Sequence, residues 1–115
     1  TLLNSDEKVV FLAEVDGKLA GQVKLITWWN GYAYIDDLIV NPEFRGQGVG
    51  RALMEAAIQW SRERRFPGIM LETQDDNVAA CKLYESCGFA LGGFDQFTLR
   101  NFKPNETALY WYLIF

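Results

Sequence analysis

The stretch Arg45-Gly46-Gln47-Gly48-Val49-Gly50 lies between a segment typical of a β-strand and a segment with helical spacing. Glycines at such a junction let the backbone turn sharply and let a ligand approach the amide groups without meeting a Cβ atom. The free N–H groups and the dipole at the start of a helix favour bound phosphate. The stretch therefore predicts a loop that binds phosphate or pyrophosphate, with Arg45 and Arg51 placed to add charge-assisted contacts.

Two other kinds of phosphate loop do not fit these residues. A Walker loop needs Gly-Lys followed by Ser or Thr, and the sequence has no such triplet here. A dinucleotide fingerprint needs a third glycine at the position of Arg51. A tight turn without a ligand remains the alternative when the loop is considered by itself.

The residues on either side of the loop predict a sheet with helices packed on it. Asp16-Gly17 is typical of a hairpin turn, Asn41-Pro42 ends a strand, and Pro67-Gly68 ends the helix that follows the loop. Asn77 is expected to cap a second helix, which Gly88 stops. The expected elements are strands at 9–15, 19–27 and about 32–40, a helix from 49, a strand at 69–73, a helix at 78–87, and strands at 94–100 and 108–115. This order indicates an α/β or α+β fold.

The composition describes one globular domain. The chain has 115 residues, half of them apolar, and no apolar run approaches the roughly 20 residues that cross a bilayer. The first residues do not resemble a signal peptide. A net charge of −4 is the wrong sign for a protein that coats nucleic acid. We expect a single cytoplasmic domain over residues 1–115, with no membrane or nucleic-acid partner.

The residue types narrow the available chemistry. The sequence has no histidine, which removes the usual general base and the commonest zinc ligand. Cys81 and Cys87 point in different directions on the predicted second helix and are expected to be small apolar residues, kept reduced. We therefore expect no metal site, and the candidate bases are carboxylates.

Two separate motifs resemble those of the GNAT superfamily of N-acetyltransferases. Arg-x-x-Gly-x-Gly at 45–50, after the strand Ile35-Asp36-Asp37-Leu38-Ile39-Val40, resembles the family's acetyl-CoA signature. The residues that resemble its second signature are Leu71-Glu72-Thr73, Asn77, Ala80, Leu83-Tyr84-Glu85 and Gly88-Phe89. The segments 28–37, 70–77 and 108–112 give a closer resemblance, to the streptothricin (nourseothricin) acetyltransferases.

The resemblance implies a mixed, mostly antiparallel sheet with helices on both faces. GNAT domains usually begin with a strand and one or two helices that form a wall of the acceptor site, whereas this chain starts at what should be the second strand. The resemblance thus implies an N-terminally incomplete domain, in which a preceding segment or another chain supplies that wall. Both a monomer and a homodimer remain open.

Acetyl-CoA is the cosubstrate that the resemblance implies. The backbone of Leu38, Ile39 and Val40 is expected to bind the pantetheine arm and polarise the thioester carbonyl. The resemblance also implies that Asn77 contacts the same arm and that Tyr84 protonates the departing thiolate. The comparable basicity of a phenol and a thiolate allows that proton transfer. The remaining expected contacts are Arg45, Gly46, Gln47, Gly48, Val49, Gly50, Arg51 and Ala80. The alternative is that Tyr84 is a packed helix residue and Asn77 only a cap.

Transfer to an amine requires removal of a proton, which a carboxylate can accept directly or through a water. Glu72 lies before Asn77 at a spacing where some GNAT enzymes carry their base. Asp36 is expected on the same strand face as Tyr34, and Asp37 on the opposite face. The alternatives are a solvent-facing role for Glu72 and a structural hydrogen bond for Asp36. Asp75 and Asp76 are expected in the turn before the second helix.

Aromatic residues precede these carboxylates. The aromatic residues expected to line the acceptor pocket, since aromatic faces attract cations, are Trp28, Trp29, Tyr32 and Tyr34, together with Asp36 and Glu72. Core packing is the alternative for the tryptophans. The sequence therefore predicts an N-acetyltransferase for a primary amine of a small cationic molecule, a streptothricin-type antibiotic, with resistance as the outcome. The alternatives are an aminoglycoside, a protein N-terminus or a lysine as acceptor, and a non-catalytic acetyl-CoA-binding module.

Overall fold

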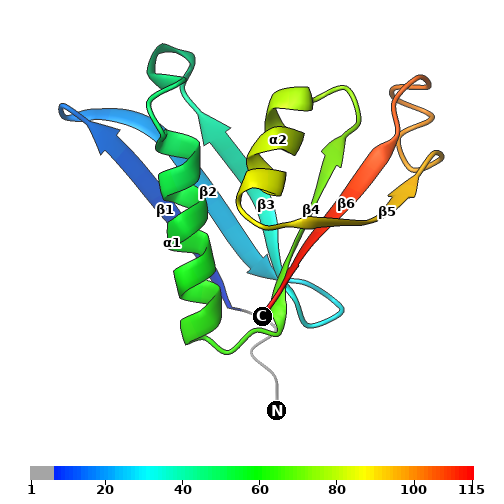
Figure 1. Ribbon diagram of the computed structural model, residues 1–115, viewed down its shortest axis with the longest axis horizontal. Helices are drawn as coiled ribbons and strands as arrows, with labels where there is room; N and C mark the ends of the chain where they lie inside the picture. Colours follow the sequence, from blue (N-terminus) through cyan, green and yellow to red (C-terminus); the bar gives the residue numbers. More distant parts are fainter. Residues whose placement is uncertain (1–6) are drawn as a thin grey trace.

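Six strands of the computed structural model, which describes residues 7–115, form one mixed sheet in the order β1-β2-β3-β4-β6-β5 (Figure 1). All neighbouring strands are antiparallel except β3 and β4, which are parallel. The elements are β1 (Lys8–Val15), β2 (Lys18–Thr27), β3 (Ala33–Val40), a 3₁₀ helix (Pro42–Phe44), α1 (Val49–Glu63), β4 (Gly68–Gln74), α2 (Val78–Ser86), β5 (Ala90–Asp95) and β6 (Ala108–Ile114). The predicted mixed, mostly antiparallel sheet with two helices is confirmed.

Local sequence signals explain where these elements begin and end. Asp16 and Gly17 have φ angles of 52° and 77°, as the two-residue turn between β1 and β2 requires. The side chain of Asn77 accepts a hydrogen bond from the Ala80 amide at the start of α2. Gly88, with a φ of 95°, follows Cys87, the C-cap of that helix. The predicted hairpin, helix cap and helix stop are all present.

The helices α1 and α2 cover the same face of the sheet (Figure 1). The buried stripe of α1 includes Leu53, Ala57 and Trp60, and it belongs to the same core cluster as Tyr84 of α2. Within residues 7–115 no helix covers the other face. The expectation of helices on both faces is therefore not met in the described chain, because both apolar stripes pack on one core.

The predicted strand at 94–100 is wrong in its position. The observed β5 begins at Ala90 and ends at Asp95, whose carboxylate accepts hydrogen bonds from the amides of Phe97 and Thr98. Those two bonds turn the chain out of the sheet. The strand instead starts directly after the turn that follows α2, and a bulge at Gly92 keeps it paired with β6.

The parallel pair at the centre of the sheet separates along its length. β3 pairs with β4 only through Ala33 with Ile69 and Tyr34 with Met70, whereas β4 pairs with β6 along its whole length. Figure 1 shows β3 and β4 close together at one end and diverging toward the other, where α2 lies beside the opening. The sheet is therefore split beyond Tyr34.

Candidate active site

The glycine loop between β3 and α1 presents backbone amides to solvent. Gly46 and Gly48 both have a φ of 80°, and no atom lies within 4 Å of a Cβ built on either. Gly48 is the N-cap of α1 and receives no side-chain cap. Within the described chain, the amides of residues 46–51 donate no backbone hydrogen bond to another residue. These amides, aligned with a helix N-terminus, are suited to bind an anion.

Two residues of the loop have structural contacts as well. A Cβ built on Gly50 would lie 3.3 Å from Leu83, so this glycine lets α1 approach α2 closely. The guanidinium of Arg51 donates a hydrogen bond of 2.7 Å to the Ser86 hydroxyl. Arg51 is therefore tied to α2 at the edge of the loop, while Arg45 is exposed beside it.

A groove of about 500 Å³ runs from this loop to α2 and β3. Most of the predicted cofactor contacts line it, namely Leu38, Val40, Arg45, Gly46, Gly48, Val49, Gly50, Arg51, Asn77, Ala80 and Tyr84. Ile39 and Gln47 do not line it, and both are exposed. Phe44, Ala79 and Leu83 complete the wall and were missed, although the helical spacing of Ala79 and Leu83 relative to Ala80 and Tyr84 was a usable signal.

A smaller cleft of about 250 Å³ continues the groove into the gap between β3 and β4. Leu38, Asn77 and Tyr84 line both spaces and mark their junction. Because β3 loses its partner β4 after Tyr34, the edge of β3 that faces the cleft offers unpaired backbone groups. An extended ligand can add to such an edge by main-chain hydrogen bonds.

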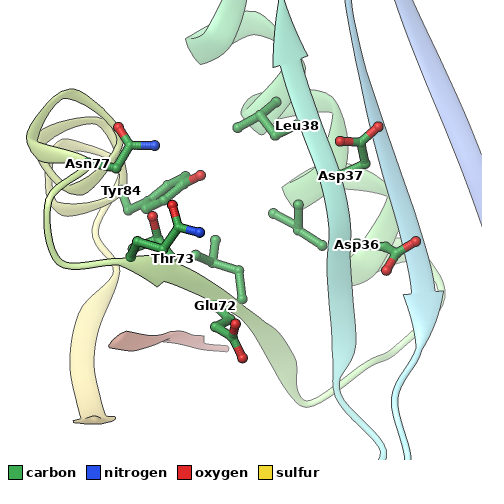
Figure 2. Close-up of a pocket in the computed structure, with 10 residues that line it drawn as sticks. Asp36, Asp37, Leu38, Glu72, Thr73, Asn77 and Tyr84 are labelled. Atoms are coloured by element: carbon green, nitrogen blue, oxygen red, sulfur yellow. The ribbon is translucent and has the colours of Figure 1, made fainter. Parts of the chain in front are cut away.

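Tyr84 lies at this junction with its ring packed and its hydroxyl directed into the gap (Figure 2). The residue is 8% exposed, and its ring contacts those of Phe89 and Trp111. Burial, with a smaller contribution from Cys81, raises the pKa of Tyr84 to about 12. The hydroxyl therefore keeps its proton at neutral pH. Asn77 uses its side-chain oxygen to cap α2, and Figure 2 shows its nitrogen directed toward β3.

A β-bulge in β3 changes which carboxylates face the cleft. Asp37 pairs with Lys24 of β2, and Ile35 pairs with Leu25, so Asp36 is the extra residue. The Asp36 carboxylate lies 3.5 Å from the Lys24 amine. The Asp37 carboxylate accepts a hydrogen bond of 2.9 Å from the side chain of Gln22, which lies on β2 like Lys24. Figure 2 shows both aspartates on one side of β3. The expectation that Asp37 faces away from Asp36 is wrong, because the extra residue interrupts the alternation of side chains.

Glu72 approaches the same side of the cleft from β4. It is exposed, and Figure 2 shows its carboxylate on the side of the gap away from Tyr84. It pairs across the sheet with Tyr110 of β6. No lysine or arginine of residues 7–115 forms an ion pair with Glu72, whereas Asp36 has Lys24. Of these two carboxylates, only Asp36 has a cationic partner among the described residues. Asp75 and Asp76 lie in the turn after β4, as predicted.

A third cavity, of about 410 Å³, lies next to Glu72 on the face of the sheet without helices. The rings of Trp28 and Tyr34 stack there with centroids 4.0 Å apart. Burial, followed by the charges of Glu72 and Asp36, raises the pKa of Tyr34 to about 12. Of the residues predicted to line the acceptor pocket, Trp28, Trp29, Tyr34 and Glu72 line this cavity, whereas Tyr32 and Asp36 do not. Met70, Tyr110 and Tyr112 line it too and were missed, because pairing between β4 and β6 brings them there. Asn30 and Thr98, which lie in turns, also line it and were missed.

The three spaces form one path through the sheet. The groove and the cleft share Tyr84, and the cleft and the aromatic cavity share Glu72. The Tyr84 hydroxyl thus lies on the helix side of the gap, and carboxylates lie on the other side. Residues 2–89 match the model of the Acetyltransferase (GNAT) family.

The chain belongs to the GNAT acetyltransferase family.

Individual relatives agree with this assignment. The streptothricin acetyltransferase of Escherichia coli is 43% identical over 95% of this chain and 64% of its own length. Streptothricin acetyltransferase A of Bacillus subtilis is 40% identical, over 98% of this chain and 66% of its own. A Bacillus anthracis protein assigned as a streptothricin acetyltransferase, solved with acetyl coenzyme A, is 44% identical with a TM-score of 0.90, over 98% of this chain and 65% of its own. This GNAT chain thus spans slightly less than two thirds of these relatives.

Further features of this GNAT chain concern membranes and metals. No helix among residues 7–115 has the length and hydropathy that a membrane span needs. The same residues contain no group of three or more histidine, cysteine or carboxylate side chains arranged to hold a metal ion. Cys81 and Cys87 are unpaired and half-buried.

Proposed function

We propose that this protein is an acetyl-CoA-dependent N-acetyltransferase that acetylates a primary amine of a small cationic acceptor of the streptothricin type. The observation that carries the proposal is that the glycine-loop groove adjoins the cleft between β3 and β4, which carboxylates line, and that this cleft adjoins the aromatic cavity. In this arrangement the two substrates enter from opposite faces of the sheet and meet in the gap.

The helix side of the path suits acetyl-CoA. The amides of residues 46–51 would hold the pyrophosphate, because the positive φ angles at Gly46 and Gly48 keep the loop open and no Cβ intrudes. The unpaired edge of β3 after Tyr34 would hold the pantetheine arm in extended form. Figure 2 shows the side-chain nitrogen of Asn77 directed toward that edge.

The other side of the path suits an amine. An alkylamine with a pKa near 10.4 is almost wholly charged at neutral pH and must lose a proton before it can react. We assign Glu72 as the group that accepts this proton, since no cationic partner among the described residues neutralises it. Asp36 and Asp37 would hold the ammonium group, because the bulge directs both toward the acceptor side.

Tyr84 is suited to protonate the sulfur of the departing CoA. Its hydroxyl points into the gap, and its raised pKa keeps the proton in place at neutral pH. A thiolate formed in the same desolvated position would also be more basic than in water, so the two groups remain matched.

The relatives support the choice of acceptor. Two of them, which cover at least 95% of this chain at 40% identity or more, are streptothricin acetyltransferases. The test is a measurement of CoA release and product mass with streptothricin, an aminoglycoside and a peptide with a free N-terminus. We expect turnover with streptothricin to exceed that with the other two. Faster turnover with the aminoglycoside or the peptide would contradict the proposed acceptor. Acetyl-CoA binding without turnover of any of the three amines would indicate a non-catalytic module.

A further inference from the structure

The aromatic cavity lies beyond the position where the amine must react. A reacting nitrogen has to reach the cleft, which Tyr84 and Leu38 connect to the groove. The cavity of about 410 Å³ shares only Glu72 with that cleft. A group that occupies this cavity is therefore a second part of the acceptor and not the amine that is acetylated.

The walls of the cavity are fixed before any ligand binds. Trp28 stacks on Tyr34 with an interplanar angle of 13°, and Tyr32 packs edge-on against Tyr112. Trp28 is held by its own turn, in which its amide donates to the Tyr32 carbonyl and its carbonyl accepts from Gly31. Rings that are already ordered lose little entropy when they contact a ligand.

The charge of the cavity is negative. Glu72 is the carboxylate in its wall, and no lysine or arginine lines it. Burial and then the charge of Glu72 raise the pKa of Tyr110, which shows that the two groups interact across the sheet. Aromatic faces beside an uncompensated carboxylate favour an organic cation.

We infer that the aromatic cavity binds a second cationic group of the acceptor, so that the enzyme selects diamines and larger polyamines over monoamines. The inference rests on the proposed function, because it takes the cleft as the place of acetyl transfer. Glu72 lies between the two spaces and would face both charged groups.

The test compares pentylamine with 1,5-diaminopentane, which differ only in the second amine. Isothermal titration calorimetry of the full protein with CoA present measures the affinity for each amine, and CoA release in parallel samples measures turnover from acetyl-CoA. We expect the diamine to bind at least tenfold more tightly, well above the twofold that two equivalent amines give statistically. This advantage corresponds to about 1.4 kcal/mol.

Variants of Trp28 decide whether the cavity supplies this advantage. Trp28→Leu should reduce it to about twofold, and Trp28→Phe, which keeps an aromatic face, should restore part of it. Phe102→Leu removes an aromatic ring that is 83% exposed and lines none of the three spaces, and should leave the advantage unchanged. Retained CoA binding would show that the Trp28 variants are folded.

The two measurements separate the possible failures. Equal affinity of the wild-type protein for both amines would overturn the inference, as would an advantage that survives in Trp28→Leu, whatever the turnover. A diamine advantage that depends on Trp28, without turnover of either amine, would support the second cationic subsite and contradict the proposed acetyltransferase activity.

Discussion

The two sides of the path are built from different parts of the chain. On the helix side, most of the groups available to a ligand are backbone groups. The amides of residues 46–51 and the unpaired edge of β3 depend on glycine and strand geometry, not on particular side chains. On the other side, the surface consists of side chains from three strands and two turns, with Asp36, Glu72 and Trp28 among them.

This difference has a functional meaning. A surface made of backbone groups suits a ligand that does not change, and the proposed acetyl donor, acetyl-CoA, is the same in every reaction. A side-chain surface can vary without disturbing the fold, and it determines which acceptor is used. Tyr84 and Glu72 lie where the two surfaces meet. Substitutions of these two residues should therefore have different kinetic effects.

The largest effect is expected from Tyr84→Phe. The change removes only the hydroxyl, and the ring can keep its contacts with Phe89 and Trp111. Turnover should fall by roughly 10²–10⁴-fold, as expected for a lost general acid, while both substrates still bind. Tyr32→Phe is the matched control, because Tyr32 lines none of the three spaces. A steady-state rate for Tyr84→Phe equal to that of the wild type would indicate that Tyr84 is only a packing residue.

Gly48→Val should weaken acetyl-CoA binding by about tenfold to a hundredfold. Valine at a φ of 80° strains the loop and places a branched side chain near the proposed phosphates. Gly17→Val is the matched control, since Gly17 has a φ of 77°, has open space around it and lies in the β1–β2 turn. Calorimetric titration with acetyl-CoA checks both. Equal losses in the two variants would mean that strain alone explains the effect.

A smaller effect is expected from the two aspartates of the bulge. Asp36→Asn and Asp37→Asn should each raise KM for the amine by a few-fold and leave KM for acetyl-CoA unchanged, because both face the acceptor side. Steady-state kinetics with each substrate varied in turn measures this. A raised KM for the amine in Asp36→Asn but not in Asp37→Asn would contradict the bulge. It would indicate that the side chains of β3 alternate regularly between the two faces.

The smallest effect concerns stability at high pH. The pKa values of Tyr84 and Tyr34 are raised from 10.0 to about 12, so between pH 10 and 12 the folded state holds protons that the unfolded state has released. The free energy of unfolding should therefore be unaffected by these groups below pH 10 and should decrease as pH rises toward 12. Urea unfolding across this range should show a shallower decrease in Tyr84→Phe. An identical decrease of the unfolding free energy with pH in both proteins would indicate that burial does not raise the pKa of Tyr84.

The helix side could be predicted from sequence more completely than the acceptor side. Positive φ angles, a helix start and a helix stop are local, and Gly48, Asn77 and Gly88 signal them directly. The orientation of Asp37 depends on an extra residue in the pairing with β2, which only the partner strand reveals. Tyr110 and Tyr112 reach the aromatic cavity through their pairing with β4. The end of the displaced β5 depends on hydrogen bonds that the Asp95 carboxylate accepts from the amides of Phe97 and Thr98.

The pH dependence of Glu72→Gln tests the central claim most directly, namely that acceptor chemistry takes place on the carboxylate side and donor binding on the helix side. We predict that kcat falls about tenfold or more at neutral pH and recovers partly at high pH, where the amine is already neutral. KM for acetyl-CoA should stay at the wild-type value throughout. A near-normal kcat at neutral pH, or a change confined to acetyl-CoA binding, would contradict the account.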